Sequence, residues 1–291
     1  MYRVQNAIIM AAGTSSRFAP LSFERHKALI SVKGEILIER QIKQLRDAGI
    51  KEIIIVTGYK AEQFEYLREK FDVKLIYNPD YLMRNNNGSI HAIKDYLCNS
   101  YVCSADNYFS ENPFEKEVND SYYAALYSED YTNEWCMTED DEGYISAVTI
   151  GGSHAWYMMG HTFWNDDFCK EFIRILESEY EREEMVNKLW ESIYRDHLDT
   201  LKMRIKKYPD SAIFEFDSLD ELRLFDSTYI SDTRSPIIKR ISNELKVPES
   251  RIVNISGRKT VDLSASGFTF ECDGEHYSYE YETNELKKEI Q

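Results

Sequence analysis

The stretch AIIMAAGTSSRFAPLSFERHKAL occupies residues 7–29 and decides the fold of this chain. It begins with a short apolar run, Ala7 to Ala12, which indicates a buried parallel strand. A loop of small residues follows, with Arg17 at its end and Lys27 ten residues later. Small residues let backbone N–H groups approach an anion closely, and the two cations add positive charge. The stretch therefore predicts a phosphate-cradling loop and a nucleotide as its ligand.

The loop alone leaves a purely structural role open, because a tight turn between a strand and a helix also produces Ala-Ala-Gly. Neither of the two common nucleotide loops is present. The G-K-[ST] ending of a P-loop is missing, and so is the full G-x-G-x-x-G of a dinucleotide fold. The residues of this loop that we assign to the nucleotide are Ala11, Ala12, Gly13, Thr14 and Ser15.

AAGTSSR at residues 11–17, followed by Lys-Ala-Leu at 27–29, resembles the signature of the sugar-phosphate and alcohol-phosphate nucleotidylyltransferases. That signature usually reads AAG-x-G-x-R and then PK-x-L. This chain departs from it twice, with Ser15 at the second glycine and His26 at the proline. A serine fits at position 15 if its backbone keeps an ordinary conformation, which is our expectation.

Predicted helices and strands alternate after the loop. The spacing of apolar residues predicts helices at 37–47, 61–71 and 89–97, and strands at 52–57, 73–77 and 101–104. Such alternation predicts an α/β fold with a Rossmann-like, mainly parallel sheet and helices on both of its faces. Ligands gather at the carboxyl ends of the strands in such sheets, where we expect Gly13, Asp106 and residues 85–89.

The middle of the chain predicts an antiparallel excursion of this sheet, followed by two helices. The predicted strands are 122–127, 134–137, 144–150, 155–160, 201–206 and 213–216, and the predicted helices are 166–178, 183–197 and one beginning at Ser218. We expect a nucleotidylyltransferase domain over 1–230. Residues 231–291 predict a small α+β appendage with a helix at 237–245 and strands at 251–255, 267–272 and 276–282.

The composition of the chain argues against several classes of protein. A formal net charge of −16 opposes binding to nucleic acid, because a polyanion is repelled. The five cysteines show no CxxC spacing, which supports neither a disulfide framework nor a zinc site. No run of eighteen apolar residues and no signal-peptide core occur, so we expect a cytoplasmic protein without membrane insertion. The sequence leaves open whether the protein forms a homodimer.

Two aspartates are the predicted metal ligands. Asp106 follows a buried strand, and Asp217 follows a strand-like segment, with Glu215 as the fallback. Carboxylate oxygens are the ligands that Mg²⁺ prefers, and Mg²⁺ bridges phosphates. The competing interpretations are a turn aspartate at 106 and an ordinary helix cap at 217.

Two further groups of residues predict substrate contacts. Asn86 and Ser89 carry groups that match a pyrimidine edge, although a plain surface turn gives the same sequence. Aromatic rings and carboxylates hold a cationic acceptor well, although single rings more often pack in a core. The residues that we assign to the acceptor are Tyr108, Tyr131, Glu134, Trp135 and Trp190.

A narrower resemblance joins four segments of the chain. MAAGTSSR, DAGIKEIIIVTGYKAEQFEYLREKF, ADNYF and YTNEW are similar to segments of the bacterial CTP:phosphocholine cytidylyltransferases, over about residues 7–225. The resemblance implies that Arg17 and Lys27 bind phosphate, that Asp106 binds Mg²⁺, and that Trp135 faces choline. It implies attack of an acceptor oxygen on the α-phosphorus of CTP, with no general base. Leu189 departs from the family, which has an aromatic residue there.

Several alternatives remain at this point. The acceptor is phosphocholine, phosphoethanolamine, 2-aminoethylphosphonate or a sugar 1-phosphate, and the non-enzyme alternative is a catalytically silent nucleotide-binding regulator. The final residues weakly resemble the start of a choline-kinase amino lobe, but the chain ends before any kinase catalytic loop. We expect a vestigial or interaction module there, and we expect that deletion of residues 233–291 leaves nucleotide transfer intact.

Overall fold

The computed structural model describes residues 1–261 and 264–289. The chain divides into two compact units. The first, here called the sheet unit, consists of Met1–Gly13 and Ile38–Phe214, and the second, here called the C-terminal unit, consists of Thr14–Leu37 and Glu215–Gln291. The C-terminal unit thus includes residues from near the start of the chain, and residues 1–230 draw on both units.

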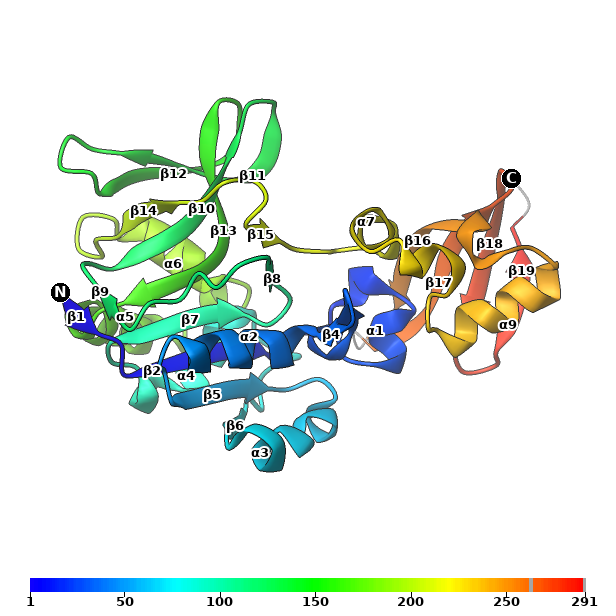
Figure 1. Cartoon of the computed structure of the whole chain (residues 1–291), viewed down its shortest axis with the longest axis horizontal. Coiled ribbons are helices and arrows are strands. Elements are labelled where there is room, and N and C mark those ends of the chain that lie inside the picture. The colour runs from blue at the N-terminus through cyan, green and yellow to red at the C-terminus, as the bar shows by residue number, and fades with distance from the viewer. Residues whose placement is uncertain (262–263, 290–291) are drawn as a thin grey trace. The chain divides into compact units, whose positions relative to one another are not determined.

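A nine-stranded mixed sheet forms the centre of the sheet unit (Figure 1). Its parallel strands lie in the order β7 (Ser100–Ser104), β2 (Asn6–Ala11), β5 (Glu52–Thr57) and β6 (Lys74–Tyr77). Their apolar runs are buried because helices cover both faces, with α2 (Leu37–Asp47) on one and α5 (Asp166–Glu179) on the other (Figure 1). These boundaries match the predicted strands within one residue.

The remaining strands continue the sheet beyond β7, mostly in antiparallel pairs. They are β10 (Tyr122–Ser128), β11 (Thr132–Glu139), β12 (Ile145–Gly152), β13 (Ala155–Trp164) and β14 (Arg204–Lys207). Only β14 runs parallel to its neighbour, β10. The predicted fold class, a Rossmann-like α/β sheet with an antiparallel excursion and a small additional sheet, is confirmed.

Short elements complete the sheet unit. They are β1 (Tyr2–Arg3), β9 (Glu117–Val118), β8 (Tyr108–Phe109), β15 (Ile213–Phe214), η3 (Ala61–Phe64), α3 (Tyr66–Phe71), α4 (Asn86–Ala92), η4 (Lys94–Tyr96), η5 (Glu183–Met185) and α6 (Trp190–Asp196). Three predicted helices differ from these, and the first of them, 61–71, is divided into η3 and α3. The helix predicted at 89–97 begins at Asn86 because the Asn85 side chain, rather than Ser89, caps it, and the stretch 183–197 is divided into η5 and α6.

The C-terminal unit combines two separate stretches of the chain. Its early elements are η1 (Ser16–Phe18), α1 (Leu21–Glu24), η2 (Lys27–Leu29), β3 (Ser31–Val32) and β4 (Glu35–Ile36). Its late elements are α7 (Leu219–Phe225), α8 (Thr228–Ser231), α9 (Pro236–Leu245), η6 (Glu249–Arg251), β16 (Ile252–Lys259), β17 (Ala265–Cys272), β18 (Glu275–Glu280) and β19 (Glu285–Lys288). The last four strands form an antiparallel sheet, to which β19 is an unpredicted addition.

The early stretch is packed directly against the late one. Ala19 belongs to the same buried cluster as Ile238 of α9 and Phe268 of β17. The rings of Phe23 and Tyr281 stack with centroids 3.7 Å apart. The C-terminal residues therefore form a shared core with the segment that carries Arg17 and Lys27.

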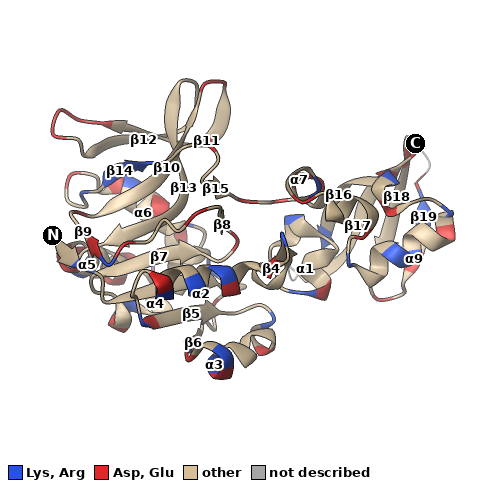
Figure 2. Ribbon diagram, viewed as in Figure 1, with Lys and Arg blue, Asp and Glu red and all other residues tan. Residues whose placement is uncertain are grey.

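The surface carries charges of both signs. Figure 2 shows Lys and Arg scattered along the ribbon among Asp and Glu, rather than gathered in one stripe. Among residues 1–261 and 264–289, no helix combines the length and apolar character that crossing a bilayer requires.

Candidate active site

Three predicted site residues meet in the C-terminal unit. An Nη of Arg17 lies 2.7 Å from one carboxylate oxygen of Asp217, and the Nζ of Lys27 lies 3.4 Å from the other. The Arg17 side chain is mostly exposed, whereas Lys27 is buried at 3% exposure. Two cations from the start of the chain thus converge on one carboxylate that lies 190 residues after Lys27.

The local sequence explains how Lys27 is presented. The Nδ1 of His26 accepts a hydrogen bond of 3.1 Å from the backbone N–H of Ala28 and so caps η2, the turn that contains Lys27. The Lys27 ammonium lies 5.8 Å from the ring centroid of Phe18, which is itself buried. His26 therefore supplies a cap at the position where the signature has proline.

Ser15 does not have the ordinary backbone that we expected. Its φ is 47° and its ψ is 42°, in the left-handed region, where an L side chain is strained. The expectation was wrong because the chain turns sharply before η1, and the signature's glycine suits that turn better. Ser15 therefore keeps the backbone shape of the signature at an energetic cost.

The beginning of the predicted phosphate loop lies in the sheet unit. Ala11 and Ala12 are buried, whereas Gly13 is exposed and a Cβ on it would meet no atom within 4 Å. The Ala12 carbonyl accepts a 3.0 Å hydrogen bond from the N–H of Tyr59, and a Cβ on Gly58 would lie 2.8 Å from that carbonyl oxygen. Thr14, the first residue of the C-terminal unit, is partly exposed.

Asp106 lies at the sheet edge that the sequence predicts. It follows the end of β7 by two residues, and β7 pairs in parallel with β2, with Ser104 opposite Met10. The carboxyl ends of these strands, and with them Asp106 and Gly13, therefore share one edge of the sheet. The Asp106 side chain is partly exposed. Among the residues described, no group of three His, Cys, Asp or Glu side chains is placed to hold a metal.

The two predicted base-contacting residues make internal hydrogen bonds. Asn86 donates through Nδ2 to Glu191, 2.9 Å away, and its Oδ1 accepts the backbone N–H of Trp190 at 2.7 Å. The Ser89 hydroxyl accepts a 3.3 Å bond from Asn78, and Ser89 is buried. Any contact of these side chains with a base would have to replace or extend these bonds.

Glu191 contacts the predicted site residue Asn86, and the sequence analysis did not single it out. One of its carboxylate oxygens accepts from Asn86, and the other accepts the Tyr123 hydroxyl at 3.5 Å. Burial raises the pKa of Glu191 to about 7, and the hydrogen bond from Asn86 opposes that rise. The adjacency of Glu191 to Trp190 in the sequence was the available signal, but helical spacing does not show that this carboxylate points inward.

The predicted acceptor residues have unequal access to solvent. Tyr131 is 69% exposed and Glu134 is also exposed, whereas Trp135 is partly buried beside the main core cluster. The guanidinium of Arg195 lies 5.4 Å from the ring centroid of Trp135. A cation therefore already lies near this ring.

Two further predicted acceptor residues have their rings engaged within the sheet unit. Trp190 is 1% exposed and stacks on Tyr123, which places it in the core. The ring of Tyr108 lies under the guanidinium of Arg40 at 4.6 Å.

Comparison with known proteins gives the chain its family. Residues 7–112 match the model of the MobA-like NTP transferase domain. A choline-phosphate cytidylyltransferase of Streptococcus pneumoniae is 35% identical over 217 residues, which cover 75% of this chain and 95% of that enzyme. The chain belongs to the choline-phosphate cytidylyltransferase family.

Other relatives extend this result. A choline-phosphate cytidylyltransferase of Haemophilus influenzae is 33% identical over 219 residues, covering 74% of this chain and 94% of that enzyme. A 2-aminoethylphosphonate cytidylyltransferase of Lancefieldella rimae is 36% identical over 234 residues, covering 79% and 95%. Enzymes named for two different acceptors are thus about equally similar to this family member.

A solved structure shares the fold of this family member. The CTP:phosphocholine cytidylyltransferase of Streptococcus pneumoniae superimposes with a TM-score of 0.74 at 34% identity, over 78% of this chain and 99% of that one. More than a fifth of this chain therefore has no counterpart in that enzyme. An inositol-1-phosphate CTP transferase of T. maritima, 14% identical with a TM-score of 0.59, shares the fold.

Proposed function

We propose that the protein joins CTP and phosphocholine to give CDP-choline and pyrophosphate. The observation that carries this proposal is the convergence of Arg17 and Lys27 on a single carboxylate, in a chain that covers 95% of a choline-phosphate cytidylyltransferase. Two cations that meet on one anion form an arrangement suited to phosphate oxygens.

The chemistry requires two anions to meet. A phosphate oxygen of the acceptor forms a bond to the α-phosphorus of CTP, and the bond from that phosphorus to the β-phosphate oxygen breaks, releasing pyrophosphate. The attacking oxygen is already anionic near neutral pH, so no residue has to remove a proton. Arg17 and Lys27 lower the repulsion by binding phosphate oxygens in place of the Asp217 carboxylate.

Mg²⁺ is the proposed cofactor, and Asp106 and Asp217 are its proposed ligands. Both supply hard oxygen donors, which suit this cation. Asp217 is engaged with Arg17 and Lys27, so transfer of these cations to the nucleotide frees its oxygens for the metal. When bound, Mg²⁺ would neutralise phosphate charge and assist the departure of pyrophosphate.

The identity of the acceptor is the part of the proposal that has a strong alternative. The 36% identical relative named for 2-aminoethylphosphonate supports that compound as the alternative acceptor, and phosphoethanolamine has the same primary ammonium group. The exposed Tyr131 and Glu134 beside Trp135 suit a cationic acceptor better than a sugar 1-phosphate. A cytoplasmic location with no nucleic-acid partner remains a prediction, and a homodimer remains open. The silent nucleotide-binding regulator is the non-enzyme alternative.

Pyrophosphate release tests the proposal directly. The full chain is supplied with CTP and Mg²⁺ and, in separate reactions, with phosphocholine, phosphoethanolamine, 2-aminoethylphosphonate or glucose 1-phosphate. We expect the highest kcat/KM with phosphocholine and no release after EDTA is added. A higher kcat/KM with 2-aminoethylphosphonate would transfer the assignment to that acceptor, and no release with any acceptor would favour the silent regulator.

A further inference from the structure

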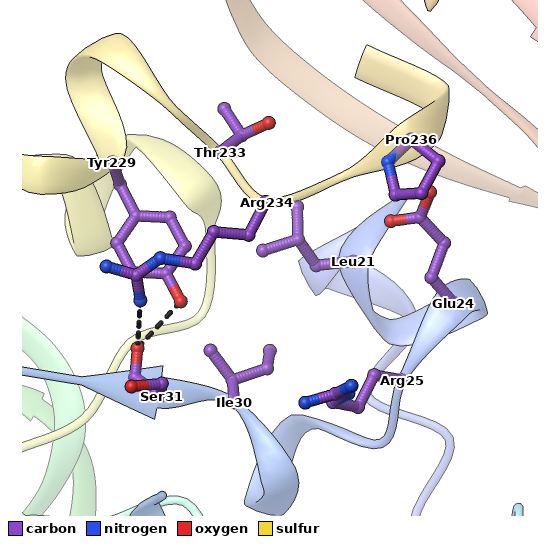
Figure 3. Close-up of a pocket in the computed structure, with 9 residues that line it drawn as sticks. All are labelled: Leu21, Glu24, Arg25, Ile30, Ser31, Tyr229, Thr233, Arg234 and Pro236. Carbon is purple, nitrogen blue, oxygen red and sulfur yellow. Dashed lines mark hydrogen bonds between the residues drawn. The ribbon is translucent and has the colours of Figure 1, made fainter. Parts of the chain in front are cut away.

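The C-terminal unit has a pocket whose lining contains none of the predicted site residues. It has a volume of about 320 Å³ and is lined by Leu21, Glu24, Arg25, Ile30, Ser31, Tyr229, Thr233, Arg234 and Pro236 (Figure 3). This volume is at the lower end of the range for small-molecule sites. Early and late stretches of the chain both contribute to its wall, so the pocket exists only when the unit is assembled.

Two arginines face the pocket without an ion-pair partner. Arg25 is exposed, and within residues 1–261 and 264–289 its guanidinium has no hydrogen bond or ion pair. Within the same residues Arg234 forms no ion pair, and its guanidinium donates to the Ser31 carbonyl at 2.9 Å and the Thr228 hydroxyl at 2.8 Å. Asp226 and Asp232 are the carboxylates that interact with it electrostatically. Neither arginine of the pocket is therefore held in an ion pair within the described residues, although the chain carries a net charge of −16.

The acidic residue of the pocket is already engaged. An oxygen of Glu24 accepts a 3.0 Å hydrogen bond from the backbone N–H of Ile237, in the first turn of α9. Burial is the main cause that raises the pKa of Glu24, and the hydrogen bond from Ile237 opposes that rise. Glu24 therefore serves the start of α9 and does not neutralise either arginine by an ion pair.

The geometry holds Arg234 in place and leaves Arg25 available. The Arg234 guanidinium lies 4.2 Å from the ring centroid of Tyr229, and both side chains donate to the carbonyl of Ser31. Figure 3 shows Arg234 and Tyr229 on one side of the pocket and Arg25 on the other, with Leu21 and Ile30 between them. A fixed cation, a free cation and an apolar floor therefore surround the same space.

We propose that this pocket binds a small organic anion, a carboxylate or a phosphate ester with a compact apolar body. Guanidinium groups match the planar oxygen pair of a carboxylate and the oxygens of a phosphate. Leu21, Ile30 and Pro236 would contact the apolar part. The site is additional to the nucleotide site, because its residues are distinct from Arg17, Lys27 and Asp217.

The pocket shares a segment of the chain with Lys27, so a ligand in the pocket can influence the proposed nucleotide site. Arg25 and Ile30 flank Lys27 in the same segment, and the N–H of Ile30 donates to the Lys27 carbonyl at 3.1 Å. An anion that draws Arg25 inward would bias the conformation of the turn that presents Lys27. The occupant would therefore act as an effector of catalysis, in addition to being a ligand.

Calorimetric titration of the full chain without CTP tests the site. The probes are benzoate and phenyl phosphate, with phenol as the uncharged control. We expect at least one anion to bind with a millimolar or lower Kd and phenol to bind at least tenfold more weakly. Arg25→Gln should raise the Kd by about tenfold or more, since a charge-assisted hydrogen bond contributes about 1.5 to 3 kcal/mol.

Two variants locate the binding. Arg174→Gln removes an exposed arginine of the sheet unit and should leave the Kd unchanged. Lys27→Ala should keep the Kd within about threefold, because Lys27 does not line the pocket. Loss of binding in Lys27→Ala with full binding in Arg25→Gln would assign the probe to the nucleotide site and overturn the proposal. Absence of anion binding, or equal binding of phenol, would also overturn it, whatever the outcome of the pyrophosphate assay.

Discussion

Ser15 has a left-handed backbone that glycine adopts more easily, and the strain has a measurable cost. An L residue in this region costs the folded state about 1 to 2 kcal/mol of free energy. Glycine removes this strain, but its greater freedom in the unfolded chain cancels part of the gain. We expect Ser15→Gly to raise the free energy of unfolding by up to about 1 kcal/mol in urea titrations. Ser16→Gly, at a residue without positive φ, should lower it, and equal losses in both variants would contradict the strain.

Lys27 is the residue whose removal should separate catalysis from folding. Without its ammonium, Asp217 keeps Arg17, but the nucleotide loses one of its two proposed cations. We expect Lys27→Ala to lower kcat by about 100-fold, the scale for one lost electrostatic contact in a transition state. Lys170→Ala, at an exposed ion pair of α5, is the matched control. Unchanged pyrophosphate release in Lys27→Ala would remove Lys27 from the mechanism.

Glu191 should make stability depend on pH. Its folded pKa of about 7 lies above the usual glutamate value of 4.5, so the folded state binds its proton more tightly. The stability associated with this residue is therefore complete below pH 4.5 and is lost as the pH rises through 7. We expect Glu191→Gln to change stability little at pH 5 and to raise it by about 1 to 3 kcal/mol at pH 8. An equal effect at both pH values would contradict the raised pKa.

At the level of elements, β16 and η1 pack backbone to backbone at Gly257. A Cβ on this residue would lie 2.3 Å from the carbonyl oxygen of Ser16, so alanine cannot fit without moving η1. We expect Gly257→Ala to destabilise the chain by about 1 to 3 kcal/mol and to raise the KM for CTP, because η1 carries Arg17. Ser256→Ala adds no atoms and should change the KM little. A normal KM in Gly257→Ala would show that η1 does not depend on β16.

Sequence patterns predicted the elements well where one periodicity dominates. The run Glu52–Thr57 and the helix Leu37–Asp47 have the predicted bounds, and Ser218 caps α7 as expected. Sequence patterns predicted the structure less well where tertiary contacts determine the conformation. The apolar character of Ala19 predicts that it is buried, but not that its partners Ile238 and Phe268 lie more than 200 residues later in the chain. The left-handed φ of Ser15 is likewise set by its surroundings.

At the scale of the whole molecule, the final residues share a core with the phosphate-binding segment. The cluster of Ala19, Ile238 and Phe268, and the stack of Phe23 on Tyr281, disappear when residues 233–291 are removed. These contacts argue against our expectation from sequence that deletion leaves nucleotide transfer intact. We now expect the truncated chain to lose most of its pyrophosphate release, while circular dichroism still shows a folded sheet unit. Full activity would show that residues 14–37 fold without these partners.

Because the two units are interleaved in the sequence, the two stretches of the C-terminal unit are synthesised at different times. A ribosome makes Thr14–Leu37 long before Glu215–Gln291, so the first stretch leaves the exit tunnel before its packing partners exist. Before Asp217 is synthesised, the nascent chain can form its sheet while Arg17 and Lys27 do not yet have their ion-pair partner. The packing of the segment that carries Arg17 and Lys27 is therefore completed only after the late stretch of the C-terminal unit has been synthesised.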